Sequence, residues 1–332
     1  MSATAGDMCQ SPRAVAENIL DLVGHTPLVR INRLAKGLPV TVYAKLEMLN
    51  PGGSAKDRIA IAMIDAAEKE SRIRPGDTIV EATAGNTGAG LALVAAQRGY
   101  RCIFTMPDKM SEDKVRLLKA FGAEIVMTPT NVAPDDPESY NGKADQIARD
   151  IGGFRPGQFT NPNNPLAHYL TTGPEIWEAL AGRVDYYVAG MGTGGSISGT
   201  GKFLKEKNPN LTVIGADPEG SILSGDEPRS YKVEGIGEDF FPETFDPTVV
   251  DTMVRVSDAQ SFTMARRLAK EEGILAGGSC GTAMHAALSY ASGLPNDGPL
   301  KNMVVLLPDT GRNYLSKIFN DDWMRDNGFP LD

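Results

Sequence analysis

The sequence predicts an α/β protein with two doubly wound, mostly parallel sheets that are flanked by helices, with a cleft between the sheets. Three observations predict this fold class. The chain has 332 residues, which is about the length of two domains. Strand-like and helix-like runs alternate along almost all of it. The strand-like runs are continuously apolar, as expected of parallel sheets that helices cover on both faces.

The first half of the chain predicts three strands separated by two helices. In order, these are strand 78–83, helix 88–99, strand 101–107, helix 111–122 and strand 123–130. Ser111 is the expected N-cap of the second helix, and Gly122 is expected just past its end. The polar, turn-rich stretch 131–143 predicts a surface loop.

The second half repeats this rhythm. In order, the expected elements are strand 184–190, helix 195–207, strand 211–217, helix 258–273 and strand 302–308. The helix beginning at Asp258 has the clearest helical periodicity. Ligands of such folds bind outside the carboxyl ends of the strands. The loops that follow the strands are therefore the candidate site.

Composition excludes several classes of protein. The chain has 42 acidic and 33 basic residues and no concentrated basic patch, which argues against binding to nucleic acid or to an anionic membrane. We expect no signal peptide, because the first 20 residues have neither a basic nor an apolar region, and no apolar run reaches the roughly 18 residues of a membrane span. Cys9, Cys102 and Cys280 are few and far apart, which fits a reducing cytoplasm. No Cys or His group has the spacing of metal ligands.

The loop "TAGNTG" follows the strand at 78–83 and precedes a helix. Gly85 and Gly88 allow the backbone to approach a ligand, while Thr83, Asn86 and Thr87 supply polar side chains. Together with the free N–H groups of the helix, they predict a site for a small anion such as a carboxylate. Ordinary helix capping by Thr and Asn is the alternative.

The loop "GMGTGGSISGTG" also joins a strand to a helix and predicts a phosphate site. Its candidate phosphate contacts are Gly192, Thr193, Gly194, Gly195 and Ser196. Gly190, Gly192 and Gly195 also satisfy the G-x-G-x-x-G pattern, and Asp217 follows about 20 residues later. A nicotinamide-dependent dehydrogenase is therefore an open alternative.

Lys56 follows "NPGGSA" and opens a helix. A positive charge at that end opposes the helix dipole, and a lysine in a desolvated cleft has a lowered pKa and can form a Schiff base. A Schiff-base lysine together with a phosphate loop suggests pyridoxal phosphate. A dehydrogenase would give Lys56 no role. Asp309 and Thr310, at the end of another strand, could also point into the cleft.

The remaining candidates have ordinary structural interpretations. His25, His168 and His285 are each interpreted as structural rather than catalytic. Cys280 lies in a small-residue loop and is interpreted as a packed thiol. Neither residue type therefore adds a catalytic candidate.

Six motifs, in this order, carry a resemblance to a known family: "NPGGSAKDR", "ATAGNTG", "GTGGSISG", "DPEGSIL", "VEGIGEDFFP" and "PDTGRNYLSK". From residue 19 to residue 329 the chain resembles the fold-type II pyridoxal-phosphate enzymes of the cystathionine β-synthase and cysteine synthase group. It is most similar to the catalytic core of cystathionine β-synthase. The resemblance implies a tryptophan synthase β-like fold with the cofactor in the cleft. It also implies a larger cofactor-binding domain (13–48 and 155–320), a smaller mobile domain for the substrate carboxylate (49–154) and a flexible leader (1–12).

The resemblance also implies roles for individual residues. Lys56 would hold the cofactor as an internal aldimine and later transfer a proton, Asn86 would bond the ring hydroxyl, and Thr310 would face the pyridine nitrogen. The cofactor phosphate would lie against Gly192, Thr193, Gly194, Gly195 and Ser196. The substrate carboxylate would lie against Thr83, Ala84, Thr87 and Gln158. The face of the cofactor would be lined by Gly235, Ile236 and Gly237.

The implied reaction is β-replacement on L-serine or O-acetylserine with homocysteine to give cystathionine, and the alternative is cysteine synthesis from sulfide. Ala84 departs from the family, whose loop often has serine there, and this leaves the amino-acid donor open. Because the chain resembles the bare catalytic core, we expect neither haem nor control by adenosylmethionine. We expect a cytoplasmic homodimer that acts on small amino acids and thiols, with no metal, nucleic acid or membrane partner.

Overall fold

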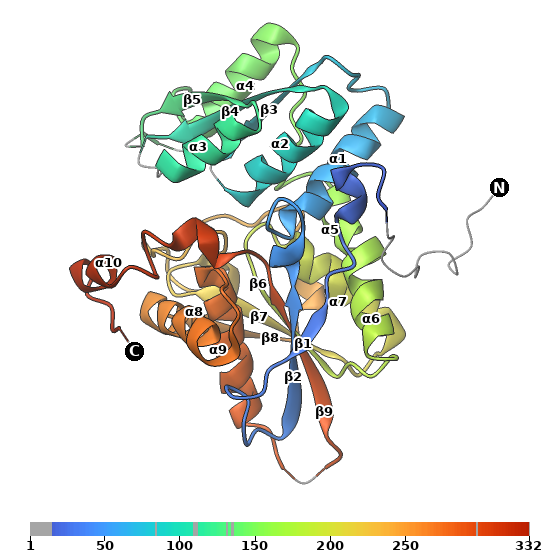
Figure 1. Ribbon diagram of the computed structural model, residues 1–332, viewed down its shortest axis with the longest axis vertical. Coiled ribbons are helices and arrows are strands. Elements are labelled where there is room, and N and C mark those ends of the chain that lie inside the picture. The colour runs from blue at the N-terminus through green and yellow to red at the C-terminus, as the bar shows by residue number, and fades with distance from the viewer. Residues whose placement is uncertain are drawn as a thin grey trace, which may run out of the picture.

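Two mostly parallel sheets flanked by helices organise the chain, which confirms the predicted fold class (Figure 1). The structure is a computed structural model. It describes residues 15–331 except 84, 109–111, 131, 134–135 and 297. The predicted leader (1–12), Cys9, Ser111 and Ala84 therefore lie outside the described residues.

The larger sheet has six strands in the order β1-β2-β9-β6-β7-β8. Their bounds are β1 (Leu28–Arg30), β2 (Val40–Leu46), β9 (Lys301–Leu307), β6 (Tyr186–Gly190), β7 (Thr212–Pro218) and β8 (Thr252–Val256). Every neighbouring pair is parallel except β1 and β2, which are antiparallel. The carboxyl ends of β2, β6, β7, β8 and β9 therefore share one edge of the sheet.

The smaller sheet has three parallel strands in the order β3-β4-β5. Its elements are α1 (Lys56–Lys69), β3 (Thr78–Ala82), α2 (Asn86–Arg98), β4 (Arg101–Pro107), α3 (Glu112–Ala120), β5 (Glu124–Thr128) and α4 (Tyr140–Ile151). Ile79 packs in the cluster that holds α1 and α2, and its neighbour Val80 packs with α4. Successive residues of β3 thus face opposite layers of helices, which explains its continuously apolar sequence.

The larger sheet is flanked by helices on both faces (Figure 1). The α-helices that follow the smaller unit are α5 (Asn163–Ala167), α6 (Gly173–Ala179), α7 (Gly195–Lys207), α8 (Asp258–Glu272), α9 (Gly278–Ser292) and α10 (Asp321–Asp326). A π-helical turn spans His168–Thr172. Single 3₁₀ turns span Ile19–Leu22, Glu47–Leu49, Ile222–Ser224, Pro247–Val249 and Gly311–Tyr314.

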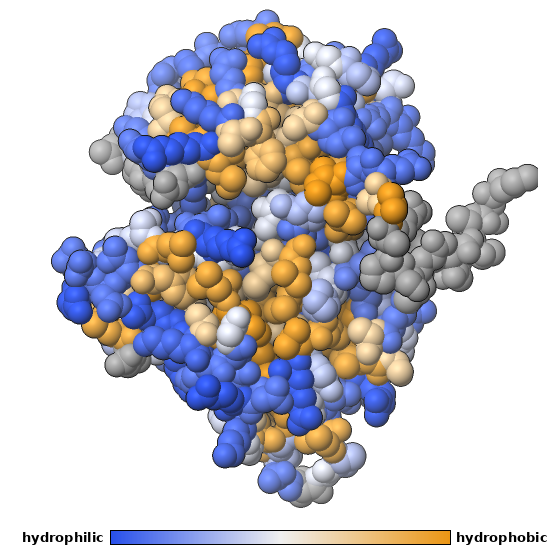
Figure 2. All heavy atoms as spheres, in the orientation of Figure 1, coloured by the Kyte–Doolittle hydropathy of each residue, from blue (hydrophilic) through white to orange (hydrophobic). Residues whose placement is uncertain are grey.

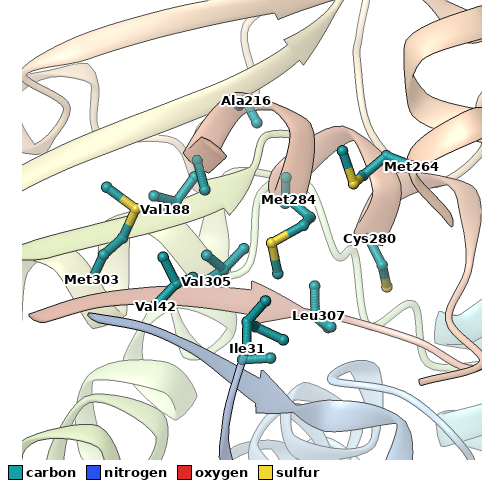
Figure 3. Packing of buried hydrophobic residues seen from close by; sticks show 14 of the residues in the cluster. Ile31, Val42, Val188, Ala216, Met264, Cys280, Met284, Met303, Val305 and Leu307 are labelled. Carbon is teal, nitrogen blue, oxygen red and sulfur yellow. The ribbon is translucent and has the colours of Figure 1, made fainter. Parts of the chain in front are cut away.

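The core of the larger unit lies between its sheet and these helices. Met284 and Cys280 of α9 point toward β9, where Val305 and Leu307 face them (Figure 3). Val304, on the opposite face of β9, packs in the cluster that contains residues of α7. Both faces of the strand are buried, and the predicted packed thiol at Cys280 is confirmed.

The predicted loop over 131–143 was wrong at its end, because α4 begins at Tyr140. The hydroxyl of Ser139 accepts the N–H of Gly142 at 3.1 Å and caps this helix. Turn-forming residues before the helix masked its start. The other predicted elements differ from the structure by no more than three residues at either end, which is the usual scatter of helix and strand boundaries.

The smaller unit stacks on the larger one, and α1 packs against α2 on one side and α5 on the other (Figure 1). In the space-filling view the molecule narrows between the two units (Figure 2). Phe154 joins the edge of the smaller sheet, because its carbonyl accepts the N–H of Val80 at 2.9 Å. The exact domain boundaries stay a prediction. None of the described helices is long and apolar enough to cross a membrane.

Candidate active site

Lys56 lies at the first position of α1, and the turn before it is bound to the end of β9. The N–H of Ala55 donates to the carbonyl of Pro308 at 2.8 Å, and the N–H of Thr310 donates to the carbonyl of Gly53 at 3.2 Å. Gly53 has a φ of +84°, which favours glycine. Backbone pairing thus places Lys56 beside Thr310, although the two are far apart in the sequence.

The amine of Lys56 lies in a partly desolvated environment. Burial lowers its pKa, whereas the carboxylates of Glu238 and Asp309 act in the opposite direction. The amine forms no hydrogen bond or ion pair with any residue that the structure describes. A lysine in this state has a larger neutral fraction and is a better nucleophile and base.

The predicted phosphate loop joins β6 to α7 and needs its glycines. A Cβ at Gly192 would lie 2.7 Å from the carbonyl oxygen of Gly235, and a Cβ at Gly195 would overlap the side chain of Asn164. Gly194 has a φ of +77° and is the N-cap of α7, so the N-cap itself has no side chain, and the N–H of Gly195 donates to Thr193 Oγ1 at 3.4 Å. The helix therefore presents backbone N–H groups, flanked by the hydroxyls of Thr193 and Ser196, to an anion.

His168 holds Ser196 of this loop, a role that the sequence interpretation did not identify. Its Nε2 lies 3.1 Å from Ser196 Oγ, and its Nδ1 lies 2.9 Å from Thr172 Oγ1. Burial lowers the pKa of His168 to about 3, so the imidazole is neutral at neutral pH. The only sequence signal was the i, i+4 spacing of His168 and Thr172, which is too common to predict a role.

The loop after β3 combines capping with groups that are open to a ligand. Thr83 Oγ1 accepts the N–H of Gly85 at 3.4 Å and of Gly88 at 3.2 Å, so the capping alternative applies to this hydroxyl. Thr87 Oγ1 instead donates to Gln158 Oε1 at 2.5 Å. Two predicted carboxylate contacts from different segments are thus brought together.

Asn86 does not cap its helix, because its side chain reaches the end of β9. Its Nδ2 donates to Asp309 Oδ2 at 2.8 Å, and the hydroxyl of Tyr314 donates to the same oxygen at 2.7 Å. Asp309 is buried, whereas Thr310 is partly exposed and accepts the N–H of Arg312 through its hydroxyl. The carboxylate of Asp309 is therefore engaged in hydrogen bonds within the protein, and Thr310 is the more accessible of the two residues.

The segment "GIGED" lies beside the carboxyl end of β6. Ile236 is buried next to Gly190, and the N–H of Gly237 donates to the carbonyl of Met191 at 2.6 Å. Gly235 has a φ of +84° and no atom near its missing Cβ. These contacts place the three residues beside the phosphate loop. The next residue, Glu238, did not figure in the sequence interpretation.

Two other features bear on alternative sites. Asp217 is fully buried and accepts the N–H of Ser224 at 2.9 Å, so it is not open to a ribose as the dehydrogenase alternative requires. Two surface hollows, one between α8 and α9 and one beside α4, contain none of the predicted site residues. Among the described residues no group of three His, Cys, Asp or Glu could hold a metal ion.

Comparison with protein families decides between the two cofactors. Residues 19–309 match the model described as pyridoxal-phosphate dependent enzyme. The chain belongs to this family. The predicted cofactor, pyridoxal phosphate, and the predicted family are thereby confirmed, and the dehydrogenase alternative was wrong.

The relatives and solved structures that the chain resembles are named for more than one activity. The chain is 47% identical to cystathionine beta-synthase of Apis mellifera over 95% of its own length, but it spans only 64% of that protein. It is also 47% identical to a cysteine synthase of Staphylococcus aureus, covering 93% of this chain and 97% of that one. A solved O-ureido-L-serine synthase shares 38% identity with a TM-score of 0.87, over 94% of this chain and 99% of the other.

Proposed function

We propose that this chain catalyses β-replacement on L-serine or O-acetylserine with homocysteine, which gives cystathionine. The observation that carries the proposal is the position of Lys56, whose lowered pKa and free amine lie at the edge where the phosphate loop and Asn86 also meet. Relatives named cystathionine beta-synthase support homocysteine as the acceptor. The similar cysteine synthase, which the chain covers almost fully, supports sulfide as the alternative acceptor.

The residues present fit pyridoxal phosphate. The glycines that tolerate no Cβ and the start of α7, whose N-cap is a glycine, suit its phosphate, Asn86 suits its ring hydroxyl, and Thr310 suits its pyridine nitrogen. Lys56 would hold it covalently. When bound, the cofactor supplies an electron sink that stabilises negative charge at Cα of an amino acid. Thr310 is neutral, so it would not favour protonation of the pyridine as a carboxylate would.

The chain's own groups would then bind and orient the amino acid. Thr87 Oγ1 donates to Gln158 Oε1 at the start of α2, where the N-cap residue Gly85 has no side chain of its own. The positive end of the helix dipole attracts the substrate carboxylate to this point. The carboxylate would break the hydrogen bond between Thr87 and Gln158 and accept bonds from both.

Lys56 would move the proton of the reaction. Released from its covalent link by the amine of the substrate, it takes the proton from Cα and later returns it to the product. Burial favours this role because it lowers the pKa of the amine toward neutral pH. Closure of the smaller unit on the substrate would exclude water from the reacting centre.

A steady-state panel tests the proposal. L-serine and O-acetylserine are each assayed with homocysteine and with sulfide, and kcat/KM is compared for the four pairs. Faster formation of cystathionine from homocysteine than of cysteine from sulfide supports the proposal. The reverse order favours the cysteine synthase alternative. Turnover of none of the four pairs contradicts both.

A further inference from the structure

Glu238 follows the segment that is predicted to line the cofactor, and its backbone is fixed on both sides. Its N–H donates to Ser221 Oγ at 3.1 Å, and its carbonyl accepts the N–H of Ile222 at 3.0 Å. Ser221 is fully buried. The preceding residue, Gly237, donates to the carbonyl of Met191, directly before the phosphate loop. The position of Glu238 is therefore set by the same edge of the sheet that bears the site.

The carboxyl group of Glu238 is partly buried but not engaged. It accepts no hydrogen bond and forms no ion pair within the part of the chain that the structure describes. Lys56 is the opposite charge that acts on it, and Glu238 is the foremost charge that acts on Lys56. Each of the two charges thus shifts the pKa of the other, although the two side chains form no ion pair.

The surroundings of Glu238 keep its proton exchangeable at neutral pH. Burial raises the pKa of Glu238 to about 7; Lys56 of α1 lowers it, while Asp239 and Asp217 of β7 raise it further. Tyr140 of α4 and Tyr231 also face this carboxyl. Two other carboxyls near the site accept hydrogen bonds. Asp309 accepts hydrogen bonds from two side chains, and Asp217 accepts one from a backbone N–H.

We propose that Glu238 protonates the departing hydroxyl of serine and takes the proton of the incoming thiol, an inference that rests on the proposed function. Lys56 has by then removed the Cα proton, and that electron pair forms the Cα–Cβ double bond. The Cβ–O bond breaks, its electron pair stays on oxygen, and the proton of Glu238 completes a water molecule. The thiol then bonds to Cβ through sulfur and gives its proton to the Glu238 carboxylate, while Lys56 returns its proton to Cα. Both residues end as they began.

This role would set the choice of donor. Hydroxide is a poor leaving group, because water has a pKa of about 15.7. Acetate leaves as a carboxylate, an anion that is stable at neutral pH and needs no proton. Glu238 is therefore required when serine is the donor and dispensable for the same step when O-acetylserine is the donor.

The first half-reaction tests this directly. Serine or O-acetylserine is mixed with the cofactor-bound protein without a thiol, and elimination is followed by stopped-flow absorbance. In Glu238→Gln we expect the serine rate to fall about 10²- to 10⁴-fold, the usual contribution of a general acid, and the O-acetylserine rate to fall far less. Glu227→Gln is the matched control, since its side chain is exposed and it is not among the charges that act on Glu238 or Lys56, and it should change neither rate. An equal loss with both donors, or no loss with serine, overturns the proposal.

A second measurement needs no catalysis. The full-length chain, freed of cofactor, is treated with formaldehyde and a mild hydride reagent at several pH values, and methylation of Lys56 is quantified by mass spectrometry. Removing the charge of Glu238 should shift the labelling profile of Lys56 to lower pH in Glu238→Gln, whereas the control Glu227→Gln should leave the profile unchanged. If the labelling profile of Lys56 is unchanged in Glu238→Gln, the charge of Glu238 does not act on Lys56, and the proposal is contradicted.

Different results would contradict the proposed function and the role of Glu238. A wild-type chain that eliminates from neither donor contradicts the proposed function. Normal elimination by the wild type, with Glu238→Gln unaffected toward serine, contradicts only the role of Glu238.

Discussion

The imidazole of His168 shows how one residue can couple the fold to the cofactor site. It contacts Ser196 on one side and Thr172 on the other, in the π-helical turn that precedes α6. We predict that His168→Ala weakens cofactor binding about tenfold, the loss expected when one orienting hydrogen bond is removed. His168→Gln keeps a polar group there and should bind more tightly than the Ala variant. Fluorescence titration of the cofactor-free chain measures both, and equal affinities for wild type and His168→Ala would contradict the positioning role.

The same residue predicts a pH dependence of stability. Because the pKa of His168 is lowered to about 3 in the folded chain, the unfolded chain binds the extra proton between about pH 6.5 and pH 3. The free energy of unfolding should therefore fall with falling pH in that window, by up to about 1.4 kcal/mol per pH unit from this residue. Urea unfolding at pH 7.5 and pH 5 checks it. In His168→Gln the contribution of the imidazole to this pH dependence should be missing. If the free energy of unfolding falls between pH 7.5 and pH 5 as much as in the wild type, His168 is not its source.

Among single residues, the sequence was enough to identify those whose chemistry is unusual for their position. Lys56 was recognisable because an amine at a helix start after two glycines has no ordinary structural reason. Glu238 and His168 were not recognisable. A glutamate in a loop and a histidine near a helix are common, and only the fold brings the charge of Glu238 under the influence of Lys56 and places His168 against Ser196.

At the scale of elements, the start of α7 shows why the phosphate loop is rich in glycine. We predict that Gly195→Ala weakens cofactor binding by at least about tenfold, because its Cβ overlaps the side chain of Asn164 and displaces the first N–H groups of the helix. Gly281→Ala in α9 is the matched control. Its Cβ overlaps the carbonyl of Ser261 in α8, away from the loop. Both variants should lose stability, but only Gly195→Ala should lose affinity for the cofactor. Equal losses of cofactor affinity would contradict the role of the 190–201 loop in binding the phosphate.

The elements themselves were largely predictable. Strands β4 and β9 are continuously apolar because helices cover both faces, and this pattern does not depend on distant contacts. The start of α4 was missed because its cap, Ser139, lies in a stretch rich in turn-forming residues. Capping by Thr83 could not be separated from ligand binding in the sequence either, because a threonine hydroxyl before a helix suits both roles.

At the scale of the whole molecule, a buried ion network joins the two units. Arg58 of α1 binds Glu47 at 2.6 Å and Glu175 of α6 at 2.7 Å, and Lys45 of β2 binds Glu175 at 2.5 Å. Burial alone would raise the pKa of Glu47, but Arg58 lowers it to about 2. The network holds α1, and therefore Lys56, against the larger sheet. The sequence could not predict it, because its partners come from separate elements.

Removing Arg58 should therefore be costly. We predict that Arg58→Met lowers the free energy of unfolding by about 3–5 kcal/mol, because Glu47 is left buried without its ion-pair partner and Glu175 keeps only Lys45. Arg325→Met, which breaks an exposed pair with Asp322, should cost less than about 1 kcal/mol. Urea unfolding at pH 7 compares the two variants. A similar small loss in both would mean that the network contributes little to the joint between the units.

Some whole-molecule properties stay predictions. The homodimer and the amino acid and thiol partners are implied only by the resemblance to the family. The cytoplasmic location is favoured only by the few cysteines. The order of strands in the larger sheet also needed the structure. Strand β9 lies between β2 and β6 because pairing of the last strand with an early one depends on the whole fold.

The most direct test of the account is the identity of the lysine that holds the cofactor. The cofactor-bound protein is reduced with borohydride, digested and examined by mass spectrometry, so that a covalent link becomes a stable pyridoxyl group on one peptide. The account predicts the group on Lys56 alone. Modification of another lysine in its place, such as the buried Lys45 or the nearby Lys114, or no modified lysine at all, would contradict it.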